Sequence, residues 1–196
     1  MKFPITLLIA YLGLFIVCGI APYDRGVWIA ENLPIIFIVV GIGIFSIFHR
    51  FSNLAYGLMA VLIVLHTIGG HYTFERVPFG FVSDLFGFER NHYDRIAHFS
   101  VGFYAFAIAE LIVAKKAVNS RTILYLFPVF TIFTVAAVYE IFEWQFALMA
   151  DPEAGIAVLG SQGDIWDAQK DMLADGLGAI TAMCLFAILR HKKASN

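Results

Sequence analysis

The sequence predicts an all-α fold, a polytopic membrane bundle of about six transmembrane helices that forms a single integral membrane domain over residues 1–196. Of these residues 60% are hydrophobic and 14% are charged, against about 25% charged residues in a typical globular domain. The mean hydropathy is +0.80, and the apolar residues gather in long runs. This composition excludes a soluble enzyme and a disordered chain, and the net charge of −2 gives no footprint for nucleic acid.

A helix that crosses a membrane needs about 20 mostly apolar residues, because the hydrocarbon core is about 30 Å thick and a helix rises about 1.5 Å per residue. Runs of nearly that length occur at 3–20, 33–48, 54–70, 96–114, 122–148 and 172–189. Helices are predicted because lipid offers no partner for an unpaired backbone amide. The alternating strands of about ten residues that build a membrane barrel do not occur in the sequence.

The first apolar run is expected to remain as a helix rather than to be a cleaved signal peptide. It is long for a signal, and no small-x-small cleavage site follows it cleanly. The two cysteines, Cys18 and Cys184, lie in apolar runs near opposite ends of the chain. They predict neither a disulfide framework nor a cysteine metal site.

Basic residues favour one orientation of the bundle. Eight of the 13 fall on the side of the two termini: Lys2, Arg50, Lys115, Lys116, Arg121, Arg190, Lys192 and Lys193. The other side has Arg25, Arg76, Arg90, Arg95 and Lys170. Because short loops rich in Lys and Arg stay in the cytoplasm, both termini are predicted to be cytoplasmic.

Acidic residues divide between the two sides more sharply. Of the 15 acidic residues, only Glu110 falls toward the cytoplasmic ends of the predicted helices. The rest belong to outer loops or outer halves of spans: Asp24, Glu31, Glu75, Asp84, Glu89, Asp94, Glu140, Glu143, Asp151, Glu153, Asp164, Asp167, Asp171 and Asp175. An ionisable side chain within a span is costly and usually marks a function.

Histidines occur in two of four such groups. His66 lies late in the third run and is followed by the segment 71–76, HYTFER. Asp94 and His98 begin the fourth run, and their spacing of four places both on one face of a helix.

The other two groups are acidic. Glu140 and Glu143 lie three residues apart, late in the fifth run. At the start of the sixth run, four aspartates follow one helix face at spacings of three, four and four: Asp164, Asp167, Asp171 and Asp175. Such a row of carboxylates is tolerable when cations neutralise it or some of its members stay protonated.

Together these residues predict a divalent metal site built between facing helices, as in carboxylate-rich bundles. The predicted ligands are His66, His98, Glu140, Glu143, Asp171 and Asp175. Oxygen ligands with one or two imidazoles suit magnesium, manganese, zinc or iron, and the sequence does not choose among them. The residues predicted to be catalytic are Asp94, His98, Glu143 and Asp171.

Four basic residues on the same side are predicted to bind an anionic substrate group such as phosphate. They are Arg76, Arg90, Arg95 and Lys170. Together with the metal site they predict, as partners, the membrane lipid and a lipid-linked substrate.

Each group also has a structural interpretation, and these alternatives stay open. His66 can be a bundle histidine bonded to a neighbouring carbonyl, and Asp94 can simply orient His98. Glu140 and Glu143 can form structural ion pairs with the outer arginines. Asp164 suits a helix N-cap, and Asp167 suits the positive end of the helix dipole. Five further polar residues are interpreted as solvated loop residues, and His92 is left open; the five are His49, Asp84, Glu89, Asp151 and Glu153.

Four long motifs carry a resemblance to a known family. They are HYTFERVP at 71–78, RNHYDRIAHF at 90–99, YEIFEW at 139–144 and GDIWDAQKDMLADG at 163–176. In these motifs the chain resembles the YjdF-like family of uncharacterised bacterial inner-membrane proteins. The resemblance implies a six-span bundle in the inner membrane and carries no activity with it.

A more distant similarity is to VanZ-like membrane proteins, which are linked to glycopeptide resistance at the cell envelope. Their Asp-Lys and His-Phe pattern resembles 94–99, their Glu-x-x-Gln resembles 140–143, and their Asp-x-x-x-Asn-x-x-Gly resembles 171–178. Here Arg95 replaces Lys, Glu143 replaces Gln and Asp175 replaces Asn. The two acidic replacements favour a cation and weaken any transfer of role.

Three functions are compatible with the sequence, and no known signature of a membrane protease, lipid phosphatase or CDP-alcohol transferase decides between them. The first is a metal-dependent enzyme of the outer leaflet that acts on a lipid-linked or envelope phosphate. The second is a cation- or proton-coupled transporter. The third is a non-catalytic module that binds an envelope lipid or partner through the aromatic segment 71–91.

Overall fold

The computed structural model describes residues 2–150 and 152–195, so Asp151 lies outside the described residues. All regular structure within this part of the chain is helical. The helices are α1 (Lys2–Ile20), α2 (Arg25–Phe48), α3 (Asn53–His71), α4 (Gly80–Phe86), α5 (Tyr93–Val101), α6 (Tyr104–Ala114), α7 (Arg121–Met149), α8 (Pro152–Leu159) and α9 (Asp167–Ser195). They confirm the predicted all-α membrane bundle.

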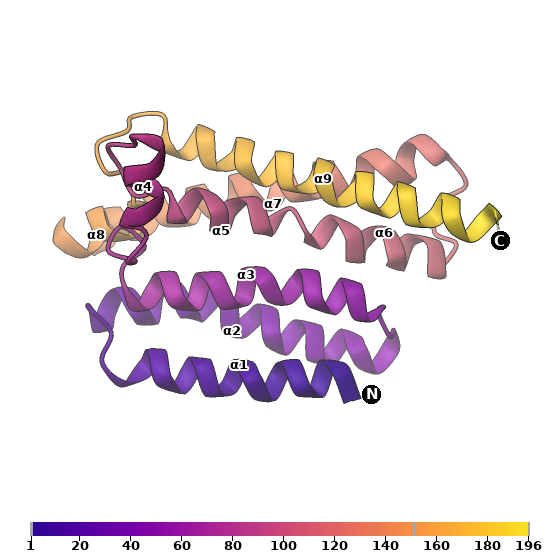
Figure 1. Ribbon diagram of the computed structural model, residues 1–196, viewed down its shortest axis with the longest axis horizontal. Helices are drawn as coiled ribbons and strands as arrows, with labels where there is room; N and C mark the ends of the chain where they lie inside the picture. The colour runs from indigo at the N-terminus through magenta and orange to yellow at the C-terminus, as the bar shows by residue number, and fades with distance from the viewer. Residues whose placement is uncertain (1, 151, 196) are drawn as a thin grey trace.

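Six helical segments of the described chain are long and apolar enough to cross a membrane, as predicted. Five are single helices, and the fourth, Tyr93–Ala114, consists of α5 and α6. The two chain ends lie at one end of the bundle, and α4 and α8 lie at the other (Figure 1). We call these the termini end and the loop end.

The second span begins earlier than predicted, at Arg25 rather than at residue 33. The physical reason is an N-cap: Asp24 Oδ1 accepts a hydrogen bond from the backbone N–H of Val27 at 2.8 Å, which satisfies a free donor of the first turn. The longer helix carries Glu31 and Asn32 into the bundle, where both are buried. Glu31 is therefore a membrane residue and not a loop residue.

The fourth span is interrupted where α5 ends and α6 begins, at Gly102 and Phe103. Phe103, Ala105 and Phe106 each donate their backbone N–H to the residue three positions earlier, the tight pattern of a 3₁₀ turn. Gly102 lies against the backbone of α9 near Gly178, so closely that a Cβ on either glycine would overlap the other helix. The missing side chains let α5 and α9 approach each other.

The two loops at the loop end contain short helices that the hydropathy pattern did not predict. The loops are joined by Asn91, whose backbone N–H donates to Gln162 Oε1 at 2.9 Å and whose carbonyl accepts from Gln162 Nε2 at 3.0 Å. α4 has no buried residue, and Phe81, Leu85 and Phe86 are exposed. This end of the bundle therefore presents aromatic and aliphatic side chains to its surroundings.

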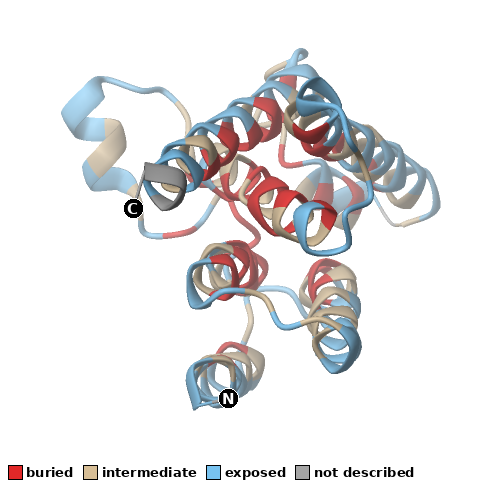
Figure 2. Ribbon diagram, turned by 90° about the vertical axis from the view of Figure 1, so that its right-hand side faces the viewer, coloured by how far each residue is buried: buried red, intermediate tan, exposed pale blue. Residues whose placement is uncertain are grey.

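The main core lies between α3, α6, α7 and α9 and is built from small and aromatic side chains such as Ala105, Ala109, Phe106 and Phe186. α1 lies at the periphery, and Figure 2 shows most of its length exposed. The buried polar residues concentrate instead toward the loop end, in α2, α3, α5, α7 and α9.

Candidate functional site

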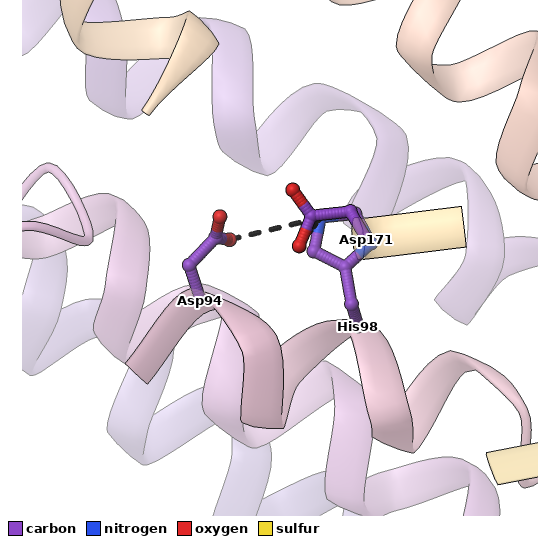
Figure 3. Close-up of side chains that lie close together, drawn as sticks. All are labelled: Asp94, His98 and Asp171. Atoms are coloured by element: carbon purple, nitrogen blue, oxygen red, sulfur yellow. Dashed lines mark ion pairs between the residues drawn. The ribbon is translucent and has the colours of Figure 1, made fainter. Parts of the chain in front are cut away.

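A buried histidine, His98, lies among three carboxylates at the contact between α5 and α9. Its Nε2 is 3.7 Å from Asp94 Oδ1 and 3.8 Å from Asp171 Oδ1. Its Nδ1 is 3.3 Å from Asp175 Oδ2. Figure 3 shows Asp94 and His98 on one helix with Asp171 facing them. We call these four residues the His98 cluster.

The regular spacing of two helices builds this cluster. Asp94 and His98 are four apart on α5, and Asp171 and Asp175 are four apart on α9, so each pair shares one helix face. The close approach at Gly102 and Gly178 then brings the two faces together. Asp175 is fully buried, and its Oδ1 has no hydrogen-bond partner among the described residues.

Two arginines bind the acidic face of α9 on the loop side of the cluster. Arg90 donates to Asp167 Oδ1 at 2.6 Å. Arg95 contacts Asp167 as well, and its second terminal nitrogen contacts Asp171. Asp167 is thus more than a partner for the helix dipole, because two guanidinium groups neutralise it.

A second buried histidine, His66 on α3, lies beside α2. Its Nε2 is 3.1 Å from Glu31 Oε2 and also 3.1 Å from the Glu31 backbone oxygen. Tyr139 of α7 donates its hydroxyl to Glu31 Oε2 at 3.3 Å. The Tyr139 ring lies between the two histidines, with ring centroids 6.1 Å from His66 and 6.4 Å from His98.

A small pocket of about 90 Å³ lies between the two histidines. Its ionisable and hydroxyl-bearing lining consists of Glu31, His66, Asp94, His98, Tyr139, Glu143 and Asp175. Apolar side chains such as Pro34, Ile35 and Phe74 complete the wall. Acids and imidazoles from five helices, α2, α3, α5, α7 and α9, therefore share one pocket.

The structure divides the six predicted metal ligands into three sets. His98 and Asp171, together with Asp94, each offer a ligand atom, and the three atoms lie within 4.8 Å of one another. His66, Glu143 and Asp175 line the adjoining pocket. Glu140 does not line it, although its Oε1 is buried and has no hydrogen-bond partner among the described residues.

Of the four residues predicted to bind an anion, Arg90, Arg95 and Lys170 gather around Asp164, at 3.5, 3.6 and 2.6 Å, whereas Arg76 has other partners. Arg76 pairs with its neighbour Glu75 at 3.3 Å and lies over the Tyr23 ring, 4.1 Å from its centroid. Lys170 is half-exposed and pairs with Asp164 at 2.6 Å. Arg90 and Arg95 are each bound to carboxylates of α9. An anion that reached these groups would have to compete with the acids of the protein itself.

Two ionisable groups at the loop end have shifted pKa values. A hydrogen bond from Lys170 and another from the backbone N–H of Trp166 hold the pKa of Asp164 below its ordinary value. Partial burial lowers the pKa of His92, and the positive charges of Arg90 and Arg95 lower it further. His92 therefore favours its neutral form.

Sequence reasoning missed Glu31 and Tyr139 as members of the pocket. For Glu31 a signal was present: Val27, Glu31 and Ile35 recur every four residues and form one buried helix face. Tyr139 lies four residues before Glu143, so that both lie on the pocket face of α7. Tyrosines are common within spans, however, and the role of Tyr139 becomes visible only from its hydrogen bond to Glu31 on α2.

The comparisons with known proteins agree with this architecture. A family model described as "Predicted membrane protein (DUF2238)" matches residues 3–192. Inner membrane protein YjdF of Escherichia coli (strain K12) is 32% identical over 176 residues, which is 89% of this chain and 84% of the relative. No solved structure matches.

These matches confirm the resemblance to the YjdF-like family, whereas the more distant VanZ-like resemblance stays a prediction. The family match and the six apolar helices agree on a multi-pass protein of the inner membrane. The chain belongs to the DUF2238 family of predicted membrane proteins.

Proposed function

We propose that this protein is a membrane enzyme that depends on a divalent cation and acts on a lipid-linked or envelope phosphate at the outer leaflet. The cation is held by Asp94, His98 and Asp171. The observation that carries the proposal is the convergence of their three ligand atoms within 4.8 Å. Ligands bonded to one cation at about 2.1 Å lie up to about 4.2 Å apart, so small side-chain movements suffice.

The orientation of His98 supports this assignment. Metal-ligating histidines usually donate their other ring nitrogen to a carboxylate, which fixes the tautomer. Nδ1 of His98 faces Asp175 at 3.3 Å, and Nε2 faces the side of Asp94 and Asp171. Asp175 thus serves as the orienting partner, and Nε2 as the ligand nitrogen.

The arginines support the site from outside. Arg95 contacts Asp167 and Asp171 together, so it fixes the carboxylate of Asp171 in the position of a ligand. The bound cation would polarise a phosphoryl oxygen or activate a water molecule. An anionic substrate is then attracted by the cation, because Arg90 and Arg95 are already bound by carboxylates.

The test is metal analysis of the protein purified without chelator, followed by titration with magnesium, manganese and zinc. The expected result is one tightly bound equivalent that is lost in His98→Gln and in Asp171→Asn. Asp84→Asn, in the exposed helix α4, is the matched control and keeps the metal. A wild-type protein with no bound metal, whose unfolding is unchanged by chelator, contradicts the proposal.

A second function is favoured by the pocket itself. Glu31, His66, His98, Tyr139 and Glu143 line it together within the spanning helices, and chains of such groups serve proton and cation pathways. Among the described residues, the half of the bundle toward the termini end has one acidic side chain, that of Glu110. Its Oε2 accepts a hydrogen bond from the backbone N–H of Ser52 at 3.0 Å. This lack of a continued acidic path ranks transport second. Proton-coupled flux into liposomes that is lost in Glu143→Gln would reverse the order.

A further inference from the structure

A groove much larger than the pocket lies among α1, α2 and α3 in the half of the bundle toward the termini end. Its volume is about 470 Å³. Aliphatic side chains dominate its walls, for example Leu7, Leu14, Ile42 and Ile63. At the loop end α1 meets α2 through the Phe15 and Trp28 rings, 5.1 Å between centroids. Toward the termini end the space between them belongs to the groove.

The length of the groove matches one leaflet of a bilayer. On α1 it extends from Pro4 to Leu14, and on α3 from Asn53 to Val64. Eleven or twelve helical residues span about 16 Å, which is about half of a hydrocarbon core of about 30 Å. The groove thus starts at a membrane boundary and ends near the midplane.

The polar lining gathers at the boundary end of the groove. Arg50 lies in the α2–α3 connection, beside Asn53 at the start of α3. Ser46 and Tyr56 lie next along the wall and share a hydrogen bond of 2.8 Å. Arg50 forms no ion pair among the described residues, so its charge is available to a ligand.

The charge of this end of the bundle selects for an anion. The described ends of the helices there carry Lys2, Arg50, Lys115, Lys116, Arg121, Arg190 and Lys192, against Glu110 alone among the described acids. A site that is apolar over one leaflet depth and basic at the boundary is complementary to an amphiphile with a negative headgroup.

We propose that this groove is a binding site for one anionic glycerophospholipid of the leaflet at the termini end. One acyl chain fills the space between α1, α2 and α3, and the phosphate binds Arg50. The site is independent of the metal site, because it lies in the opposite half of the bundle and shares no lining residue with the pocket at His98.

The chain offers a matched pair of glycines for the test. Gly43 lines the groove, and Gly41, two residues before it on α2, does not. A Cβ on either glycine meets no atom within 4 Å, so both positions accept a side chain. Gly43→Phe therefore fills the groove, and Gly41→Phe places the same ring elsewhere on the helix. Ala60→Phe fills the groove from the wall of α3.

The measurement is native mass spectrometry of the protein given equal amounts of dioleoyl phosphatidylglycerol and phosphatidylcholine. Wild type is expected to retain one phosphatidylglycerol in preference to phosphatidylcholine. Gly43→Phe, Ala60→Phe and Arg50→Gln are expected to lower its retention about tenfold, the size of one lost charge-assisted contact or one blocked chain. Gly41→Phe and Arg121→Gln are expected to retain it as wild type does.

Three outcomes overturn the proposal. The first is undiminished phosphatidylglycerol retention in Gly43→Phe when that variant has the unfolding temperature of wild type. The second is equal retention of the two lipids by wild type, which removes the role of Arg50. The third is a dimer that dissociates in Gly43→Phe, because a second copy of the chain would then occupy the groove.

Discussion

The two buried histidines of this protein differ in the number of acids around them. His66 has one carboxylate within ion-pair distance among the described residues, that of Glu31 at 3.1 Å. His98 has three, those of Asp94, Asp171 and Asp175, at 3.3 to 3.8 Å. Both residues are equally buried, at 8% exposure. The difference therefore lies in charge and not in access to solvent.

The number of acids indicates what each histidine does. Glu31 and His66 satisfy one another, as expected of a polar pair within a helix bundle. Around His98 and the start of α9, five acids meet three basic side chains, Arg90, Arg95 and Lys170; the acids are Asp94, Asp164, Asp167, Asp171 and Asp175. When all five acids are ionised and the imidazole of His98 is neutral, two negative charges remain, which is the charge that one divalent cation neutralises. His66 is thus a balanced pair, and His98 belongs to an unbalanced cluster.

The largest effect is expected from separating α5 and α9, which disrupts the His98 cluster and leaves the pair of Glu31 and His66 in place. Gly178→Ala places a Cβ against the carbonyl oxygen of Phe99, and a backbone contact of this kind cannot relax by a rotamer change. We expect it to reduce the free energy of unfolding by about 3 kcal/mol and to abolish metal binding. Unfolding in mixed micelles measures the first effect, and metal titration the second.

Gly57→Ala is the control for that substitution, because the Cβ at this position of α3 meets no atom within 4 Å. Its unfolding should resemble that of wild type. If Gly178→Ala keeps full stability and binds the metal normally, close packing of α5 and α9 does not build the site.

Removing one acid from each histidine tests the comparison directly. Glu31→Gln removes the ion-pair partner of His66 and leaves the buried imidazole without a carboxylate. It is expected to cost about 2 kcal/mol of unfolding free energy. Asp94→Asn leaves His98 with Asp171 and Asp175 and relieves like-charge repulsion, so in the presence of chelator it should cost less than about 0.5 kcal/mol or stabilise.

The measurement is the same unfolding titration for both variants, with and without added cation. Equal losses in Glu31→Gln and Asp94→Asn would show that His98 needs every one of its acids for folding. The surplus of negative charge would then be no sign of a missing cation.

The smallest effect concerns a third histidine, His92, at the loop end. Burial and the neighbouring Arg90, Arg95 and Lys170 lower its pKa, against the opposing charge of Asp164. The unfolded chain therefore binds a proton at His92 more readily than the folded protein does. The stability that this residue contributes is complete above its ordinary pKa of 6.5 and is lost as the pH falls through the lower folded value.

Wild type should accordingly lose more unfolding free energy than His92→Gln between about pH 7.5 and about pH 5.5. Unfolding titrations at the two pH values give this difference, in which contributions common to the two proteins cancel. A larger loss in the variant than in wild type would reverse the sign and contradict the lowered pKa.

Hydropathy predicted the fold because each spanning run is a local property of about 20 residues. The predicted beginning of α2 was wrong for the same reason. Glu31 and Asn32 reduce the mean hydropathy of 25–32, so hydropathy assigns this segment to a loop, although it forms a capped helix. Nothing local reports that Glu31 finds partners on α3 and α7, whereas Asn32 donates within α2 to the carbonyl of Trp28.

The sequence also predicted which faces of α5 and α9 carry the acids, since a spacing of four keeps one face. It could not predict that His66 and His98 form separate contacts, because the rotation of a helix against its neighbours depends on tertiary packing. Glu140 and Glu143 illustrate this limit. Three residues turn a helix by about 300°, and only Glu143 lines the pocket.

The acids at the start of α9 have a consequence for how the protein is made. A lone aspartate at the centre of a spanning helix costs about 3 kcal/mol, and α9 carries Asp167, Asp171 and Asp175 within its first nine residues. The arginines that neutralise Asp167 precede it in the chain by 77 and 72 residues. They are synthesised first, so α9 inserts when its positive partners at the start of the fourth span have already been made.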